Sequence, residues 1–101
     1  FDGFIKYDLD SGRQEHLRYA SLLDGVEGWL GGEVCFAPDP TRADREDGGW
    51  IISIVSHPEY ERSHVLVIDA EHITEGAVAR AELPHRVPVG FHSEFASLAS
   101  V

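Results

Sequence analysis

The stretch Trp50-Ile51-Ile52-Ser53-Ile54-Val55-Ser56 is the most hydrophobic segment of this 101-residue chain, and β-branched residues dominate it. That composition favours a buried β-strand. Residues 58–62 follow as a turn, and residues 63–69 are again almost continuously apolar. The sequence therefore predicts two consecutive buried strands joined by a turn.

Weaker strand signals lie on both sides of these two strands. The turn sequence Asp10-Ser11-Gly12 separates residues 4–9 from residues 13–19, and this arrangement predicts a β-hairpin. Residues 20–32 hold four glycines, which argue against a stable helix there. Further short strands are expected over residues 33–37, 77–83 and, as a Pro-containing edge or inward-running strand, 87–92. Short strands between turn residues are typical of an all-β sandwich, barrel or propeller, and residues 1–101 are expected to form a single unit.

The charge balance excludes several classes of partner. The net charge is −10, from 18 acidic and 8 basic residues, and the basic residues form no run or stripe. Nucleic acids and anionic membrane surfaces would be repelled by that balance, so no nucleic-acid partner is expected. The single cysteine, Cys35, leaves no internal disulfide to form.

Among six histidines, His92 has the most distinctive surroundings. It follows the apolar segment 87–91, in which Pro88 fixes φ and Gly90 permits a close backbone approach. Such a segment can hold an imidazole in one orientation. On local chemistry alone, a hydrogen-bonded core histidine is the simpler interpretation, and a metal ligand is the alternative. No pair of histidines, and no histidine with cysteine, has the spacing of a zinc site.

Other catalytic patterns are not supported by the sequence. It contains no G-x-S-x-G elbow, no G-x-G-x-x-G fingerprint and no phosphate-binding P-loop. Cys35 lies in an apolar strand, where an inert buried thiol is expected. The acidic loop with Asp39, Asp44, Glu46 and Asp47 lacks the residue order of a calcium-binding loop, so a solvated loop is expected there.

The C-terminal region resembles a known family. Residues 82–92 read Glu-Leu-Pro-His-Arg-Val-Pro-Val-Gly-Phe-His, which closely resembles the C-terminal signature of the carotenoid cleavage oxygenases. That family also includes the retinoid isomerase of the eye and bacterial stilbene-cleaving enzymes. The resemblance continues upstream in the same order and covers residues 3–95, through segments 4–9, 32–38, 45–50 and 67–70.

This resemblance implies a fold and a metal site. It implies a seven-bladed β-propeller with a non-haem Fe(II) on its axis, of which residues 1–101 form the C-terminal blades. In the family, four histidines hold the iron, and three glutamates accept hydrogen bonds from the ligand imidazoles. By match of motif, His92 corresponds to the last of the four histidines and Glu33 to one of the glutamates. The remaining ligands lie in regions that this chain lacks, and His85 is expected to have only a structural role.

The implied activity is that of a dioxygenase. With O2, the whole enzyme would cleave a carbon–carbon double bond of a carotenoid or apocarotenoid to two carbonyl products, whereas this fragment alone is expected to be inactive. One alternative is a non-catalytic β-domain that binds a lipid or protein partner through an exposed face. Burial of both sheet faces around Trp50, Ile52, Ile54, Val65 and Val67 would favour such a self-standing module. The other alternative is a stilbene-cleaving or isomerising member of the same family.

The sequence does not determine the compartment, and it is compatible with a cytoplasmic or a plastid location. A peripheral membrane contact would have to come from segments that this chain lacks. The substrate and the bond that is cleaved depend on residues outside the chain.

Overall fold

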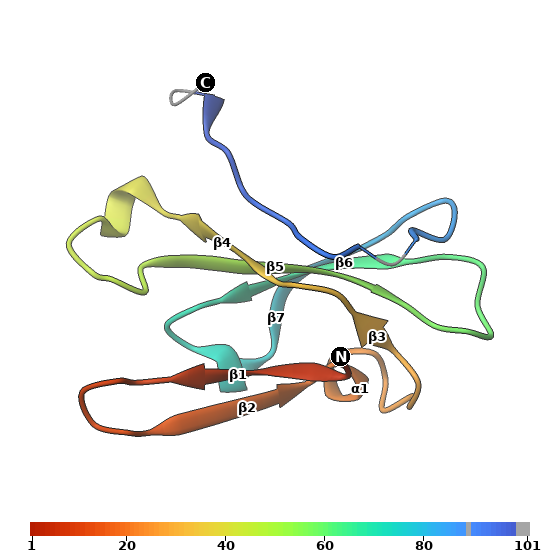
Figure 1. Ribbon diagram of the computed structural model, residues 1–101, viewed down its shortest axis with the longest axis horizontal. Helices are drawn as coiled ribbons and strands as arrows, with labels where there is room; N and C mark the ends of the chain where they lie inside the picture. Colours follow the sequence, from red (N-terminus) through yellow and green to blue (C-terminus); the bar gives the residue numbers. More distant parts are fainter. Residues whose placement is uncertain (89, 99–101) are drawn as a thin grey trace.

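The computed structural model describes residues 1–88 and 90–98, and within them the expected all-β architecture is confirmed (Figure 1). The strands are β1 (Gly3–Tyr7), β2 (Gln14–Arg18), β3 (Leu30–Gly31), β4 (Cys35–Pro38), β5 (Gly49–Ser56), β6 (His64–Asp69) and β7 (Ala77–Glu82). Three single turns of helix lie between them: α1 (Tyr19–Leu22), η1 (Pro40–Arg42) and η2 (Ile73–Glu75). The described residues contain no helix long and apolar enough to span a membrane.

The strands form two antiparallel sheets. β1 and β2 make a hairpin, and β5, β6 and β7 form the body of the larger sheet in sequence order. β3 and β4 both pair with the free edge of β5, β3 opposite residues 55–56 and β4 opposite residues 49–52. These two short strands are therefore consecutive pieces of one edge strand, interrupted at residues 32–34. Glu33 lies in that interruption.

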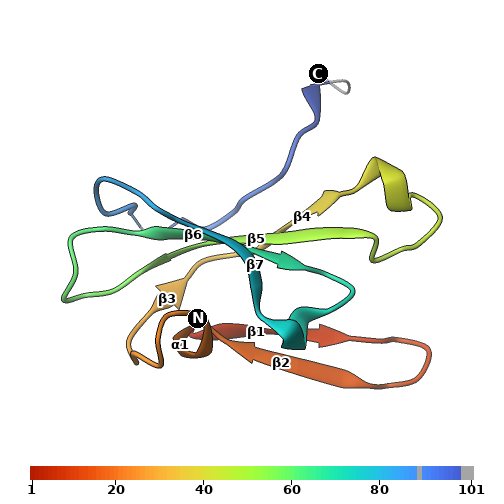
Figure 2. The ribbon, with the colours of Figure 1, turned by 180° about the vertical axis from the view of Figure 1, so that it is seen from behind.

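The core lies between the hairpin and one face of the larger sheet. Both views show the hairpin stacked beneath that sheet (Figure 1, Figure 2). Tyr19 is fully buried there and shares a 2.7 Å hydrogen bond with Ser53 Oγ, while Leu66, Ile68 and Val55 fill the space around it. Each such aliphatic side chain contributes about 1.5–3 kcal/mol by leaving water. The hairpin is thus held mainly by apolar packing.

The opposite face of the larger sheet is incompletely covered. Strand alternation places Trp50, Ile52 and Ile54 on that face, and the register pairs Ile52 with Val67 and Ile54 with Val65. Ile54 is 44% exposed, and the other four side chains are half-buried. The two buried faces expected of a self-standing module are therefore not found in the described residues.

The segment after β7 corrects one expectation. Residues 87–92 were expected to form a strand, but residues 87–88 and 90–92 have no strand pairing, and Val89 lies outside the described residues. The physical reason is that Pro88 has no N–H to donate, and the N–H of Val87 binds a serine hydroxyl in place of a neighbouring strand. The segment crosses the larger sheet on the side away from the hairpin (Figure 1, Figure 2).

Candidate functional site

The structure brings together the two residues that the sequence singled out. Nδ1 of His92 lies 3.0 Å from Oε2 of Glu33, although the residues are 59 positions apart in the chain. Glu33 comes from the interruption between β3 and β4, and His92 from the segment that follows β7. The side chain of His92 is 91% exposed and that of Glu33 is 49% exposed. The expectation of a core histidine, drawn from local sequence alone, is therefore wrong.

This contact determines which ring nitrogen of His92 is available. An ionised carboxylate can only accept hydrogen bonds, so Nδ1 carries the proton in this pair. In the neutral ring the lone pair then lies on Nε2, and no other group among the described residues hydrogen-bonds to the ring. An imidazole oriented in this way by a carboxylate is the usual arrangement of a metal-ligating histidine.

The backbone around Glu33 approaches the His92 segment closely. Ser93 Oγ donates a 2.8 Å hydrogen bond to the carbonyl of Glu33. A Cβ atom on Gly32 would lie only 2.9 Å from the carbonyl oxygen of Gly90. Glycine is therefore required at position 32 for the two segments to meet at their present separation.

One nitrogen donor is all that the described residues offer a metal at this place. Across residues 1–88 and 90–98 no three His, Cys, Asp or Glu side chains are grouped so that they could hold a metal ion. Cys35 takes no part: it is half-buried, less deeply than expected, and its thiol points to the carbonyl of Ile52 at 3.8 Å.

The acidic loop is organised by ion pairs. Asp47 binds Nζ of Lys6 at 2.6 Å, and Lys6 also donates to the carbonyl of Ala70. The hydrogen bond from Lys6 lowers the pKa of Asp47 below the ordinary aspartate value. Asp39 accepts a 2.9 Å hydrogen bond from the backbone N–H of Thr41, which is the main reason that its pKa is lowered. These two carboxylates thus have protein partners, whereas the sequence predicted a solvated loop.

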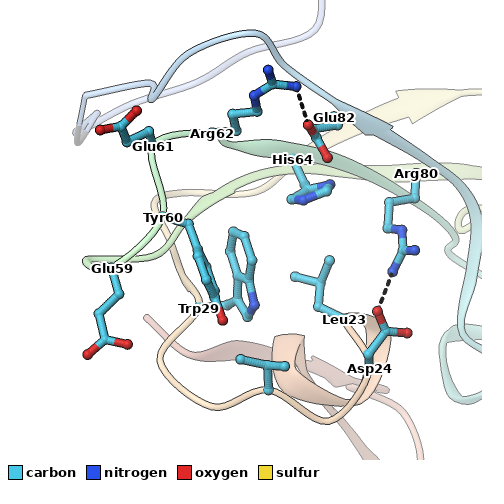
Figure 3. A pocket seen from close by; sticks show the side chains of 11 residues that line it. Leu23, Asp24, Trp29, Glu59, Tyr60, Glu61, Arg62, His64, Arg80 and Glu82 are labelled. Atoms are coloured by element: carbon cyan, nitrogen blue, oxygen red, sulfur yellow. Dashed lines mark hydrogen bonds and ion pairs between the residues drawn. The ribbon is translucent and has the colours of Figure 1, made fainter.

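The structure also has an open groove of about 580 Å³ (Figure 3). Its wall is an aromatic cluster, in which Trp29 stacks on Tyr60 at 5.5 Å and meets the ring of His64 edge-on at 5.1 Å. Its rim carries the ion pair of Arg62 with Glu82 at 2.6 Å. Neither His92 nor Glu33 lines this groove. No sequence pattern predicts this groove, because its walls come from loops and strands far apart in the chain.

The buried histidine beside this groove has a structural role. His57 accepts a hydrogen bond from the backbone N–H of Glu59 at Nδ1, at 3.0 Å. Its Nε2 therefore carries the proton and donates to the carbonyl of Glu27 at 2.8 Å. Both ring nitrogens hold the turn after β5, so neither is available to bind a metal. The side chain of His57 is also more buried than expected.

Comparison with known proteins gives a consistent set of relatives. The chain is 37% identical over 100 residues to carotenoid 9,10(9',10')-cleavage dioxygenase 1 of Arabidopsis thaliana, which covers 92% of this chain and 18% of that protein. It is 41% identical over 98 residues to the mitochondrial carotenoid-cleaving dioxygenase of Mustela putorius furo, covering 96% of this chain and 16% of that protein. The chain thus spans less than a fifth of the length of these relatives.

Solved structures agree with the sequence relatives. An ACO/RPE65 chimera superposes with a TM-score of 0.80 at 26% identity, covering 94% of this chain and 18% of its own. A cobalt-substituted Synechocystis ACO superposes with a TM-score of 0.77 at 28% identity, covering 90% of this chain and 18% of its own. The family model described as retinal pigment epithelial membrane protein matches residues 1–97. The chain therefore belongs to this family, which is the family of the carotenoid cleavage dioxygenases.

Proposed function

We propose that this chain is the part of a carotenoid cleavage dioxygenase that provides one iron-ligating histidine, His92, and the glutamate that orients it, Glu33. The observation that carries the proposal is the 3.0 Å contact between these two side chains. The relatives are named for cleavage of carotenoids, which supports a polyene substrate for the whole protein. That protein would use O2 to cleave a carbon–carbon double bond of a carotenoid or apocarotenoid into two carbonyl compounds.

The donor chemistry of His92 fits Fe(II). Neutral imidazole nitrogen is a good ligand for this ion, the side chain of His92 is exposed, and no residue that the structure describes hydrogen-bonds to its Nε2. Bound iron would supply the activation of dioxygen. The task of this chain is to present Nε2 in the correct tautomer and direction, and Glu33 supports this by accepting a hydrogen bond from the Nδ1–H group.

The incompletely covered sheet face supports a chain that works within a larger protein. Trp50, Ile52, Ile54, Val65 and Val67 form an apolar surface that the described residues leave partly open. Every residue of β7 at the edge of the sheet is exposed as well. Further propeller blades would cover such a face, whereas a self-standing module would be expected to bury both sheet faces within these 101 residues.

A graft tests the proposal. Apocarotenoid-15,15'-oxygenase of Synechocystis sp. is 32% identical to this chain over 92 residues, which form 17% of that enzyme. Replacing its matching segment with this chain should give a protein that retains stoichiometric iron and cleaves apocarotenoid. The same graft carrying His92→Ala should lose both properties. Unchanged iron content and turnover in the His92→Ala graft would show that His92 is no ligand.

A further inference from the structure

The segment that carries His92 is attached to the turn between β5 and β6. The backbone N–H of Leu83 donates to the carbonyl of Ser63 at 2.8 Å, and the N–H of Ser63 donates to the carbonyl of His85 at 3.3 Å. Among residues 86–88 and 90–92, no further hydrogen bond joins backbone to backbone. The next contacts, at Val87, are made by side chains.

Two serine hydroxyls satisfy both backbone groups of Val87. The N–H of Val87 donates to Ser63 Oγ at 2.8 Å, and Ser56 Oγ donates to the carbonyl of Val87 at 3.2 Å. The two hydroxyls lie 2.6 Å apart. Because the proton of Ser56 is used on Val87, Ser63 must donate to Ser56. The result is a closed ring of three hydrogen bonds around Val87, and Ser63 within it is completely buried.

Arg86 reinforces the same attachment. Its Nη2 lies 2.7 Å from the carbonyl of His57, 3.0 Å from that of Pro58 and 2.6 Å from that of Tyr60. A guanidinium is always charged, and hydrogen bonds from a charged donor are stronger than neutral ones. The side chain therefore ties the turn between β5 and β6 to the residue just before Val87.

His92 lies between this ring and a second attachment. On its far side, Ser93 Oγ holds the carbonyl of Glu33 at 2.8 Å. Val87 and Ser93, on either side of His92 in the sequence, are thus each held by hydrogen bonds, which reduces the conformational freedom that must be lost when the imidazole is oriented. We propose that Ser63 and Ser56 are positioning residues for His92, because their hydroxyl ring fixes the backbone of Val87. This inference rests on the proposed function.

A purely structural role for the two serines is the competing explanation, and Ser53 offers a matched control. Ser53 is a buried serine of the same strand as Ser56, and its hydroxyl also pairs with another hydroxyl, that of Tyr19, at 2.7 Å. Its hydroxyl contact lies in the core beneath the sheet, away from Val87. Ser53→Ala should therefore lower stability in a comparable way without disturbing His92.

The first experiment uses the metal-free 101-residue chain and NMR. Ser63→Ala and Ser56→Ala should speed hydrogen exchange of the Val87 amide by about fivefold, as expected for loss of one net hydrogen bond. Both should also weaken the nuclear Overhauser contacts between His92 and Glu33. Ser56→Thr keeps the hydroxyl and should preserve both signals, as should Ser53→Ala. If Ser63→Ala does not fold, the half-buried position 56 still provides the comparison.

The second experiment uses the grafted oxygenase and measures the affinity for Fe(II). Ser56→Ala should weaken it about tenfold, in the range seen when groups that orient a ligand are removed, and Ser53→Ala should not. The inference is overturned if the His92–Glu33 contacts persist in the Ser56→Ala chain. It is also overturned if Ser56→Ala leaves the iron affinity of the grafted oxygenase unchanged while His92→Ala abolishes iron binding. Failure of the proposed function would look different, because iron binding would then survive His92→Ala.

Discussion

Glu33 interacts with the His92 segment through both its side chain and its backbone. Its carboxylate binds the imidazole of His92, and its carbonyl accepts a hydrogen bond from Ser93. The second contact does not depend on the side chain, so a substitution at position 33 should leave the path of the segment unchanged. The carboxylate can therefore be tested separately from the fold.

Glu33→Gln keeps the shape of the side chain and removes its charge. A neutral amide is a weaker acceptor for the Nδ1 proton, so His92 should be a poorer and less well oriented ligand. We expect iron affinity of the grafted oxygenase to fall about 10–100-fold, the range for loss of such a partner, with the melting temperature nearly unchanged. Glu94→Gln, two residues from His92, removes the same charge and is the control. Equal affinities in the two variants would contradict the role of Glu33.

The ion pair of Asp47 with Lys6 gives a prediction for pH. The pKa of Asp47 is lowered in the folded protein because Lys6 hydrogen-bonds to its ionised form. A lowered pKa means that the stabilisation is complete above the ordinary aspartate value of 3.8 and is lost as the pH falls below it. Asp47→Asn should therefore cost about 0.2–1 kcal/mol at neutral pH, as is usual for an exposed pair, and almost nothing well below pH 3.8.

Thermal unfolding as a function of pH measures this difference. Asp44→Asn is the control, since Asp44 lies in the same loop and none of the ion pairs of the described residues includes it. A cost for Asp47→Asn that stays constant from neutral to acidic pH would show that the pair contributes no pH-dependent stability.

At the scale of secondary structure, the approach of the interrupted edge strand to the His92 segment depends on Gly32. A Cβ atom there would lie 2.9 Å from the backbone oxygen of Gly90, so one of the two segments would have to shift. We expect Gly32→Ala to cost about 1 kcal/mol by overpacking and to separate His92 from Glu33. A Cβ atom on Gly90 meets nothing within 4 Å, which makes Gly90→Ala the control.

Nuclear Overhauser contacts between the His92 ring and Glu33 report the outcome for both glycine variants. They should disappear in Gly32→Ala and persist in Gly90→Ala. Identical spectra for the two variants would show that the close approach at position 32 does not determine where His92 lies.

The sequence predicts the positions of the strands well and the conformation of the segments that connect them poorly. The apolar segments 50–56 and 63–69 form strands whose ends agree with the prediction to within one residue. The reason is that β-branched residues pack well on the pleated surface of a sheet. The prediction of a strand at 87–92 is wrong for the residues that the structure describes, because hydroxyls such as that of Ser63 can satisfy an extended backbone as well as a neighbouring strand can. Periodicity does not distinguish these two cases.

Identification of the site residues came from the family resemblance, and local chemistry alone gave a different answer. His92 looked like a core histidine, because the apolar residues before it suggested burial. In the structure its ring is exposed, and its partner Glu33 comes from the interruption between β3 and β4 in the edge strand of the larger sheet. No local pattern could join residues 59 positions apart, and neither could it reveal the hydroxyl ring around Val87.

For the molecule as a whole, the position of the core determines what this chain can do alone. The hairpin and one sheet face bury Leu66, Ile68 and Tyr19, so the strands have a core of their own. The candidate ligand is outside that core, with 91% of the His92 side chain exposed. We therefore expect folding of the chain and completion of the metal site to be separate events, the first of which does not require the second.

This separation predicts that the isolated 101-residue chain folds but is inactive. A single exposed imidazole cannot hold Fe(II) against water, because stable sites for this ion use several protein ligands together. Iron analysis after gel filtration should find far less than one iron per chain, and polyene should remain uncleaved under O2. Circular dichroism should show β-structure in the same sample, as evidence that failure to fold is not the cause. The identical residues in the grafted oxygenase should bind iron stoichiometrically. Turnover by the isolated chain would mean that the chain supplies a complete metal site by itself. The assignment of only one iron ligand to this chain would then be wrong.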